Sequence, residues 1–259
     1  MRFDDLDAKM RVYETAHDLC VLPGLFIVAR IDGRGFTKLT KERHDFEAPF
    51  DPRFRDMMHH TTEHLMGCGF HVIYAYTQSD EISLLMHRDE NSFQRKFRKF
   101  NSVLAGEASA CFSLQLGAIA SFDCRLSTFP TPELVVDYFR WRHEDAHRNA
   151  LNGHCYWMLR NQGLNARQAS KRIEGLSVSE KNEMLFQEGG LNFNDLPAWQ
   201  RRGAGFFWET YEKSAHNPLT HEDITTTRRR IHRDLELPLK EAYAEMIRAI
   251  LDEHGSGGV

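Results

Sequence analysis

Short apolar runs and amphipathic stretches alternate along the first half of the chain. The run Leu25 to Ile31 is apolar and rich in β-branched residues, which predicts a buried strand. Asp51-Pro52 is typical of a helix start, and apolar residues recur at helical spacing from there to Gly67. Two further apolar runs, 70–76 and 82–87, predict strands joined by a segment short enough for a hairpin.

The next segments complete a recognisable order of elements. The pattern predicts a helix over 92–112 and a strand over 117–128. Strand, helix, strand, strand, helix, strand is the split β-α-β, ferredoxin-like arrangement. We therefore expect an α+β fold in which an antiparallel sheet carries its helices on one face, where their apolar stripes are buried.

The second half reads mainly as helix. Helical patterns cover 131–161, 166–174 and 238–254, whereas 177–208 is rich in Gly, Asn and Pro and is expected to be loop-like with short strands. We therefore expect three parts: a catalytic core over 1–130, a mostly helical extension over 131–254 that completes the site, and a flexible tail over 255–259.

Composition restricts the class of protein. The chain is 41% hydrophobic and 27% charged, as in ordinary globular proteins. Its longest apolar run, Leu25 to Ala29, is far shorter than a membrane span, and its acidic first residues are unlike a signal peptide, so we expect a cytoplasmic protein. Five scattered cysteines without a C-x-x-C pair argue against a disulfide framework and a thiolate zinc site.

The first candidate for chemistry lies where the first strand ends, at Arg30-Ile-Asp-Gly-Arg-Gly-Phe36. Gly33 and Gly35 allow a turn whose backbone N–H groups form a concavity suited to phosphate oxygens. Asp32, beside it, can hold a hard divalent cation that also touches those phosphates. The alternative is an ordinary Asp-Gly turn.

A second carboxylate is expected close to the first. Asp80 begins the third strand, and in a ferredoxin-like sheet the first and third strands are antiparallel neighbours. Asp32 and Asp80 should then meet at one sheet edge, where they could hold a pair of Mg²⁺ ions that clamp the oxygens of a phosphoryl transfer. This is the logic of the palm domain of polymerases; the alternative is two unrelated turn acids.

Several motifs together resemble the tRNA-His guanylyltransferases and their bacterial and archaeal relatives, which add nucleotides in the 3′-to-5′ direction. They occur in order and span about residues 20 to 210. The motifs are Arg30-Ile-Asp-Gly-Arg-x-Phe36, Tyr76-x-Gln-Ser-Asp-Glu-x-Ser83, Phe122-Asp-x-Arg125, Asp137-Tyr-x-x-Trp-Arg142 and Lys181-Asn-Glu-x-Leu-Phe-Gln187.

The resemblance implies a palm-type nucleotidyltransferase. A nucleoside triphosphate, ATP or GTP, would activate the 5′ phosphate of a tRNA, and the 3′-hydroxyl of the incoming nucleotide, typically GTP, would then attack it. By resemblance, Asp32, Asp80 and Glu81 are the catalytic acids, and Asp32, Gly33 and Asp80 are the Mg²⁺ ligands. The nucleotide-binding residues would be Asp32, Gly33, Arg34, Gly35, Phe36, Thr37, Ser79 and Asp80.

Basic residues supply the remaining implied contacts. The expected helix over 92–112 would carry Arg95 and Lys99 on one face, where both could neutralise phosphate charge. By resemblance, these two residues, His147 and Lys181 contact the activating nucleotide or the 5′ phosphate. The resemblance also implies a homotetramer, in which basic clusters such as Arg228-Arg-Arg230 could hold tRNA despite a net charge of −4.

One departure from the family pattern favours a particular branch. The guanylyltransferases proper carry a His-Ile-Asn-Asn-Leu-Tyr-Asn run, whereas this chain keeps only His147, Asn149 and Leu151 of it. This degeneracy resembles the relatives that carry out template-dependent 5′-end repair, although untemplated guanylate addition to tRNA-His stays open.

Two other functions fit parts of the sequence. His143-Glu144-Asp-Ala-His147 matches H-E-x-x-H, the helical zinc signature of metalloproteases, but leaves Asp32 and Asp80 unexplained. A non-catalytic RNA-binding module could instead stack bases on aromatic residues of the central strands. Paired carboxylates at the sheet edge argue against that module, since they would repel phosphates.

Overall fold

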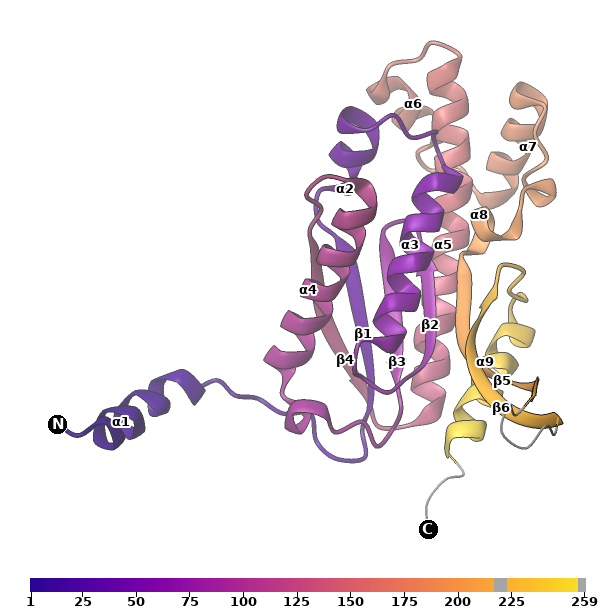
Figure 1. The fold of residues 1–259 in the computed structure, drawn as a ribbon. Helices are drawn as coiled ribbons and strands as arrows, with labels where there is room; N and C mark the ends of the chain where they lie inside the picture. Colours follow the sequence, from indigo (N-terminus) through magenta and orange to yellow (C-terminus); the bar gives the residue numbers. More distant parts are fainter. Residues whose placement is uncertain (217–222, 256–259) are drawn as a thin grey trace.

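The sheet at the centre of the molecule is antiparallel throughout. The structure, a computed structural model, describes residues 1–216 and 223–255. Within these described ranges, six strands lie in the order β4-β1-β3-β2-β5-β6 (Figure 1). Their bounds are β1 Phe26–Gly33, β2 Val72–Gln78, β3 Glu81–Met86, β4 Phe122–Phe129, β5 Ala204–His216 and β6 Asp223–Asp234. The expected α+β class with an antiparallel sheet is confirmed.

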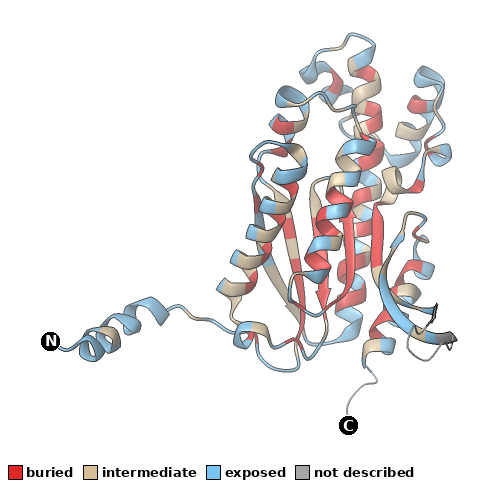
Figure 2. Ribbon diagram, in the orientation of Figure 1, coloured by how far each residue is buried: buried red, intermediate tan, exposed pale blue. Residues whose placement is uncertain are grey.

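Helices cover both faces of this sheet, because successive side chains of a strand point to opposite sides. Ile27, Ala29 and Ile31 of β1 pack with helices α3 (Pro52–Gly67) and α4 (Phe97–Leu116). The alternate residues Phe26 and Val28 pack with α5 (Pro132–Asn161) and α9 (Glu241–Gly255). Helices α3 and α4 of the first half thus lie on one face of the sheet, and helices α5 and α9 of the extension cover the other. Figure 2 shows the buried strands between these layers.

The helix starts follow from local capping. The Asp51 carboxylate accepts a hydrogen bond from the Arg53 N–H at 2.7 Å, with Pro52 at the first helical position of α3. Thr131 caps α5 in the same way. Asn165 and Ser177 form capping boxes that open α6 (Ala166–Ile173) and α7 (Val178–Gly189). The remaining short helices are α2 Phe36–Lys38, the π-helix η1 Leu39–Arg43, the 3₁₀ helices η2 Ser92–Arg95 and η3 Phe193–Asp195, and α8 Ala198–Arg202.

Three parts of the structure differ from the sequence expectation. The region expected to be loop-like contains α7, and the chain after it forms the long β5–β6 hairpin. The helix expected from residue 92 begins only at Phe97, because Phe93, Gln94 and Arg95 have positive φ. The expected tail over 255–259 lies outside the described residues except for Gly255, which ends α9.

Helix α1 (Phe3–Thr15) stands apart from the rest of the fold (Figure 1). None of its residues is buried. Its root is tied to the start of α4, where the Asp18 carboxylate pairs with Lys96 at 2.8 Å and with Arg98. Among the residues that the structure describes, no helix is long and apolar enough to cross a membrane.

Candidate active site at the sheet edge

Strand register brings the two predicted carboxylates together. Asp32, near the end of β1, lies opposite Glu81, the first residue of β3, and Asp80 occupies the turn just before it. The Gly33 N–H donates to the Asp80 carbonyl at 3.0 Å, which fixes the end of β1 to this turn. Asp32 and Asp80 therefore share one edge of the sheet, as the topology argument predicts.

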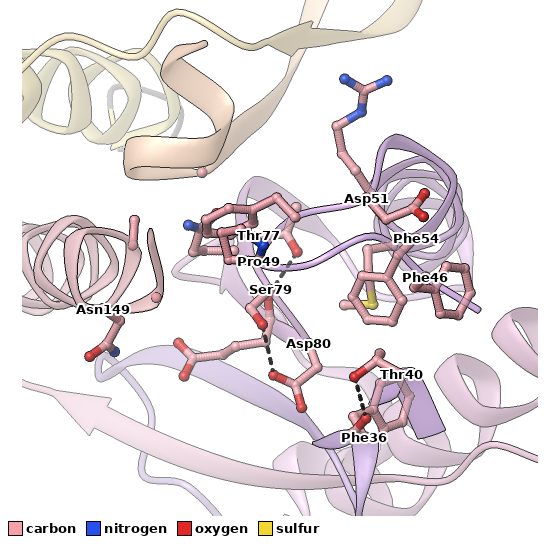
Figure 3. A pocket seen from close by; sticks show the side chains of 18 of the residues that line it. Phe36, Thr40, Phe46, Pro49, Asp51, Phe54, Thr77, Ser79, Asp80 and Asn149 are labelled. Carbon is pink, nitrogen blue, oxygen red and sulfur yellow. Dashed lines mark hydrogen bonds between the residues drawn. The ribbon is translucent and has the colours of Figure 1, made fainter. Parts of the chain in front are cut away.

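Both carboxylates line a cavity of about 520 Å³, a size usual for small-molecule sites. Figure 3 shows Asp80 beside Ser79 in this cavity. Its walls come from the end of β1 and α2, the 44–51 loop, one face of α3, the β2–β3 turn, the middle of α5, and α8. Of the residues predicted to bind nucleotide, Asp32, Phe36, Thr37, Ser79 and Asp80 line it.

The electrostatics of the site indicate a place for a cation. Burial raises the pKa of Asp80 to about 6, and the nearby Asp32 carboxylate adds to the rise. The Ser79 hydroxyl donates to Asp80 Oδ1 at 3.2 Å and partly offsets it. Arg125 lies 3.6 Å from Asp32, on the neighbouring strand. Two adjacent carboxylates, one of them half-buried, are ionised together most easily when a cation joins them.

Glu81 has a different environment from the two aspartates. Arg142 of α5 holds its carboxylate with two hydrogen bonds of 2.7 and 2.8 Å, and Arg30 lies 3.7 Å away. Burial raises the pKa of Glu81, while the Arg142 charge opposes that rise. The pair joins α5 to the β2–β3 turn and so fixes the residue that follows Asp80.

The turn after β1 is packed too tightly for a side chain at Gly33. A Cβ atom there would lie 2.6 Å from the Phe36 ring and 2.9 Å from the Asp80 Cβ. Phe36 is itself held by the rings of Phe54, Phe112 and Phe122. Gly33 is therefore required for the close approach of the turn to Asp80, and Gly35, with φ +73°, for its left-handed step.

Only some backbone N–H groups of the turn expected to bind phosphate are available to a ligand. The N–H groups of Gly33 and Arg34 are used by the carbonyls of Asp80 and Ser121. The N–H groups of Phe36 and Thr37 open a helix, where the first amides have no intrahelical acceptor. Arg34 is exposed and lies outside the cavity lining. Thr37, with its exposed hydroxyl, lies at the cavity wall.

Arg95 lies far from this site in its own chain. Its guanidinium is buried and donates to the backbone carbonyls of Val21, Leu25, Arg88 and Glu90. Leu25 and Asp32 lie at opposite ends of β1, roughly 20 Å of extended chain apart. The expectation that Arg95 and Lys99 share a helix face is wrong, because Arg95 precedes α4 and has φ +59°.

The other predicted basic contacts also lie outside the cavity lining. Lys99 places its ammonium 5.5 Å from the centre of the Phe93 ring, near Arg95. His147 meets the Phe193 ring edge-on at 5.3 Å, on the α5 surface next to η3. Lys181 is half-buried on α7, where its carbonyl accepts from the Cys155 thiol. The structure thus groups none of these residues with Asp32 and Asp80 in one chain.

The H-E-x-x-H motif does not form a zinc site among the described residues. His143 is buried and stacks on Tyr243 at 4.3 Å, and Glu144 is exposed. Burial and the Arg202 charge lower the pKa of His143 to about 4. No group of three or more His, Cys, Asp or Glu side chains arranged for a metal occurs in the described ranges. The motif residue His143 serves the core instead.

The aromatic residues required by the RNA-binding alternative are also buried. Phe26, Tyr74 and Tyr76 lie beneath α5 and α9. The Tyr76 hydroxyl donates to the Arg202 carbonyl at 2.9 Å, and the Tyr74 hydroxyl meets that of Tyr243 at 3.0 Å. This face of the sheet is therefore closed to stacking bases.

Sequence reasoning missed several residues that shape the cavity. Trp157 of α5 and Trp199 of α8 line it, and Lys41 places its ammonium 5.2 Å from the centre of the Trp157 ring. Local spacing gives no signal for them, since they come from elements far apart in the sequence. Arg142 could have been found from its place in the Trp-Arg motif combined with the acidic turn it contacts.

Comparisons with known proteins match most of the chain to one family. A family model described as tRNAHis guanylyltransferase matches residues 7–130, and one described as Thg1 C terminal domain matches residues 133–248. A probable tRNA(His) guanylyltransferase of Drosophila melanogaster is 35% identical over 72% of this chain and 68% of its own length. The tRNA(His) guanylyltransferase of Schizosaccharomyces pombe is 32% identical over 76% of this chain and 78% of its own.

Solved structures are similar over an equally long range. A bacterial tRNA(HIS) guanylyltransferase (Thg1)-like protein in complex with ATP has a TM-score of 0.76 at 27% identity, over 95% of this chain and 98% of that one. The complex of such a protein with GTP gives 0.72 at 27% identity, over 95% and 99%. The tRNA(His) guanylyltransferase of Saccharomyces cerevisiae gives 0.69 at 26%, over 75% and 90%.

Proposed function

Because this chain belongs to the tRNA(His) guanylyltransferase family, we propose that the cavity at the sheet edge is its nucleotidyl-transfer site. The chain is a nucleotidyltransferase that acts on the 5′ end of tRNA, and solved relatives hold ATP or GTP. The observation that carries the assignment is the register of β1 with β3, which sets Asp32 beside Asp80 in this cavity. ATP and GTP are the proposed nucleotide substrates.

The donor set fits Mg²⁺. Carboxylate and carbonyl oxygens are the ligands that hard divalent cations prefer. The raised pKa of Asp80, caused by burial and by Asp32, indicates that the site disfavours a second negative charge, which a divalent cation would offset. The carboxylates of Asp32 and Asp80 and the carbonyl of Gly33 would hold the metal. Bound there, two Mg²⁺ ions would supply positive charge for the attacking and leaving oxygens of phosphoryl transfer.

The protein's own residues then position the reactants. Thr37 and Ser79, at the wall and the turn, are proposed to contact the triphosphate, together with the amides that follow Gly35. We assign Glu81 to positioning rather than to direct catalysis, since Arg142 binds both of its oxygens. In the activation step the 5′ phosphate bonds to the α-phosphorus of ATP or GTP and pyrophosphate leaves. The 3′-hydroxyl oxygen of the incoming nucleotide then bonds to the activated 5′ phosphorus as it loses its proton, and the nucleoside monophosphate from the activation step leaves.

Contacts with the 5′ phosphate of tRNA are proposed for Lys99, His147 and Lys181. All three retain polar atoms near the surface of the chain, so a large substrate could reach them. Arg95 fits this role less well, because four carbonyls already occupy its guanidinium.

We further propose template-dependent 5′-end repair as the main reaction. The TM-score and the coverage are higher for the bacterial Thg1-like protein than for the Saccharomyces cerevisiae guanylyltransferase, which supports this branch. Of the three residues that the chain keeps from the guanylyltransferase run, Asn149 lines the cavity.

For this activity we propose a chain of two parts and an assembly of several chains. Residues 1–130 would form a palm-type, ferredoxin-like core, which the order β4-β1-β3-β2 and helices α3 and α4 support. Residues 131–254 would complete the site through α5 and α8. A homotetramer is proposed as the working assembly, since one chain does not gather all of the basic residues at its own cavity.

The test is extension of a 5′-labelled tRNA-His transcript and of a 5′-truncated tRNA with Mg²⁺, ATP and GTP. We expect templated extension of the truncated tRNA, reduced about 10²–10³-fold in Asp80→Asn. Asp89→Asn is the matched control, because Asp89 is exposed just beyond the other end of β3 and lies outside the cavity lining. Full activity of Asp80→Asn would contradict the site, and efficient guanylate addition to intact tRNA-His alone would contradict the repair assignment.

A further inference from the structure

The exposed helix α1 carries an apolar stripe that no described residue of its own chain covers. Phe3, Leu6, Met10 and Tyr13 are 78, 47, 53 and 70% exposed. Figure 2 shows the helix exposed over almost its whole length. A helix of 13 residues is marginal in water on its own, so most of its stability must come from packing. The apolar stripe is therefore expected to pack against another protein surface.

The spacing of the stripe indicates what kind of surface this is. The four residues follow one another at intervals of three, four and three, which is the a/d pattern of a heptad repeat. Globular helices that pack on a core usually show a broader apolar face. A narrow a/d seam is instead the pattern by which one helix packs along another.

The charges beside the seam select the partner and its direction. With Phe3 and Met10 as a positions, the g position inside the helix is the basic Lys9, and Arg2 precedes the helix as its extended N-cap residue. The e positions are the acidic Asp7, which also pairs with Arg11 of its own helix, and Glu14. In a parallel pair, each g residue faces the e residue five positions later in the other helix. Lys9 then meets Glu14, which joins opposite charges, and Arg2, just before the helix, is the basic residue nearest to Asp7 of the other helix.

The reverse orientation is unfavourable for the same residues. In an antiparallel pair, e positions face e positions and g positions face g positions. Asp7 would lie near Glu14 of the other helix, and the two Lys9 side chains would lie near each other. Both contacts join like charges, so the sequence of α1 is complementary to itself only in the parallel direction.

We propose that α1 pairs in parallel with α1 of a second copy of this chain. The pairing does not rest on the proposed chemistry. Its two-heptad seam is short, so it adds to contacts between the two bodies rather than holding them alone. The ion pairs of Asp18 with Lys96 and Arg98 anchor the root of α1 to α4, so the seam is presented from a fixed point of the fold.

Cysteine cross-linking of the full chain tests the seam. In a parallel pair Leu6 lies opposite Leu6, whereas in an antiparallel pair of the same seam it lies opposite Met10. We expect Leu6→Cys to give a disulfide-linked dimer under mild oxidation. Ala8→Cys, on the outer face of the same helix, should stay at the level of the wild type, which accounts for the native cysteines. Because α1 buries no residue, neither variant should disturb the fold, and circular dichroism checks this.

A charge reversal in the Leu6→Cys background tests the direction. Lys9→Glu should lower the dimer yield about fivefold, and adding Glu14→Lys should restore it. Ala8→Glu adds acid on the outer face and should leave the yield unchanged. No dimer from Leu6→Cys, or equal yields from Leu6→Cys and Ala8→Cys, would overturn the pairing. A yield unaffected by Lys9→Glu would overturn the role of the charges.

Discussion

Single side chains decide whether the catalytic turn can form, and Gly33 is the clearest case. We predict that Gly33→Ala lowers nucleotide transfer strongly and destabilises the fold, because its Cβ would lie 2.6 Å from the Phe36 ring and 2.9 Å from the Asp80 Cβ. Three packed rings prevent Phe36 from moving away. Gly106→Ala is the matched control: its Cβ meets nothing within 4 Å, and it should stabilise α4 by about 0.5–1 kcal/mol.

Urea unfolding and tRNA extension of the two variants measure this prediction. The effect should fall mainly on the rate of extension, because the displaced group is Asp80 itself. Equal activity of Gly33→Ala and Gly106→Ala would mean that the turn can rearrange without moving the carboxylate, contrary to the packing described.

A second residue-scale prediction concerns the buried imidazole of His143. Its pKa is lowered to about 4, so the folded protein keeps the ring neutral while the unfolded chain takes up a proton near pH 6.5. Stability is therefore unaffected above about pH 6.5 and falls as the pH drops toward 4. At pH 5 the loss from this one ring is about 2 kcal/mol.

His143→Phe should remove that loss, because Phe keeps the stacking on Tyr243 and carries no proton. Urea midpoints at pH 7.5 and pH 5 give the comparison, with His60→Phe on the exposed side of α3 as control. His143→Phe should show a smaller drop between the two pH values than the wild type or His60→Phe. An unchanged drop would contradict the assignment.

At the scale of elements, the sequence predicts the helices and strands whose apolar residues pack in the core. It misses the elements that are mostly exposed. The strands around Ile31 and Leu84 and the helix after Asp51 are visible because burial imposes apolar periodicity and Pro52 marks the start. The β5–β6 hairpin extends past β2, so much of it is solvent-exposed, and β6 carries Thr and Arg where a buried strand carries apolar residues. Strand β6 is held by its backbone pairing with β5, and no local sequence pattern indicates that pairing.

The candidate site likewise contains contacts that the sequence predicts and contacts that it does not. The proximity of Asp32 and Asp80 could be predicted from the sequence, because strand order and direction determine which strand ends lie close together. The contact of Glu81 with Arg142 depends on where α5 crosses the sheet, and that position is set by tertiary packing. Arg95 was placed wrongly because a helix was expected to continue through three residues that adopt positive φ.

At the scale of the whole molecule, the net charge of −4 and a polyanionic substrate require that basic residues be concentrated where tRNA binds. Arg228, Arg229 and Arg230 are adjacent and exposed on β6, where Arg229 stacks on Trp208 at 5.1 Å. We predict that Arg228→Gln/Arg229→Gln weakens tRNA binding at low salt. If each arginine neutralises one phosphate, the slope of log K against log[salt] should fall by about 1.8.

The control is Lys240→Gln/Arg248→Gln, which removes the same charge near and on α9, away from the hairpin. A change in net charge alone would alter both double variants equally, whereas a local tRNA contact alters only the β6 pair. GTP binding should be unchanged in both, since neither pair lines the cavity. Equal salt slopes for the two variants would show that tRNA approaches the molecule elsewhere, and the hairpin would then need another role.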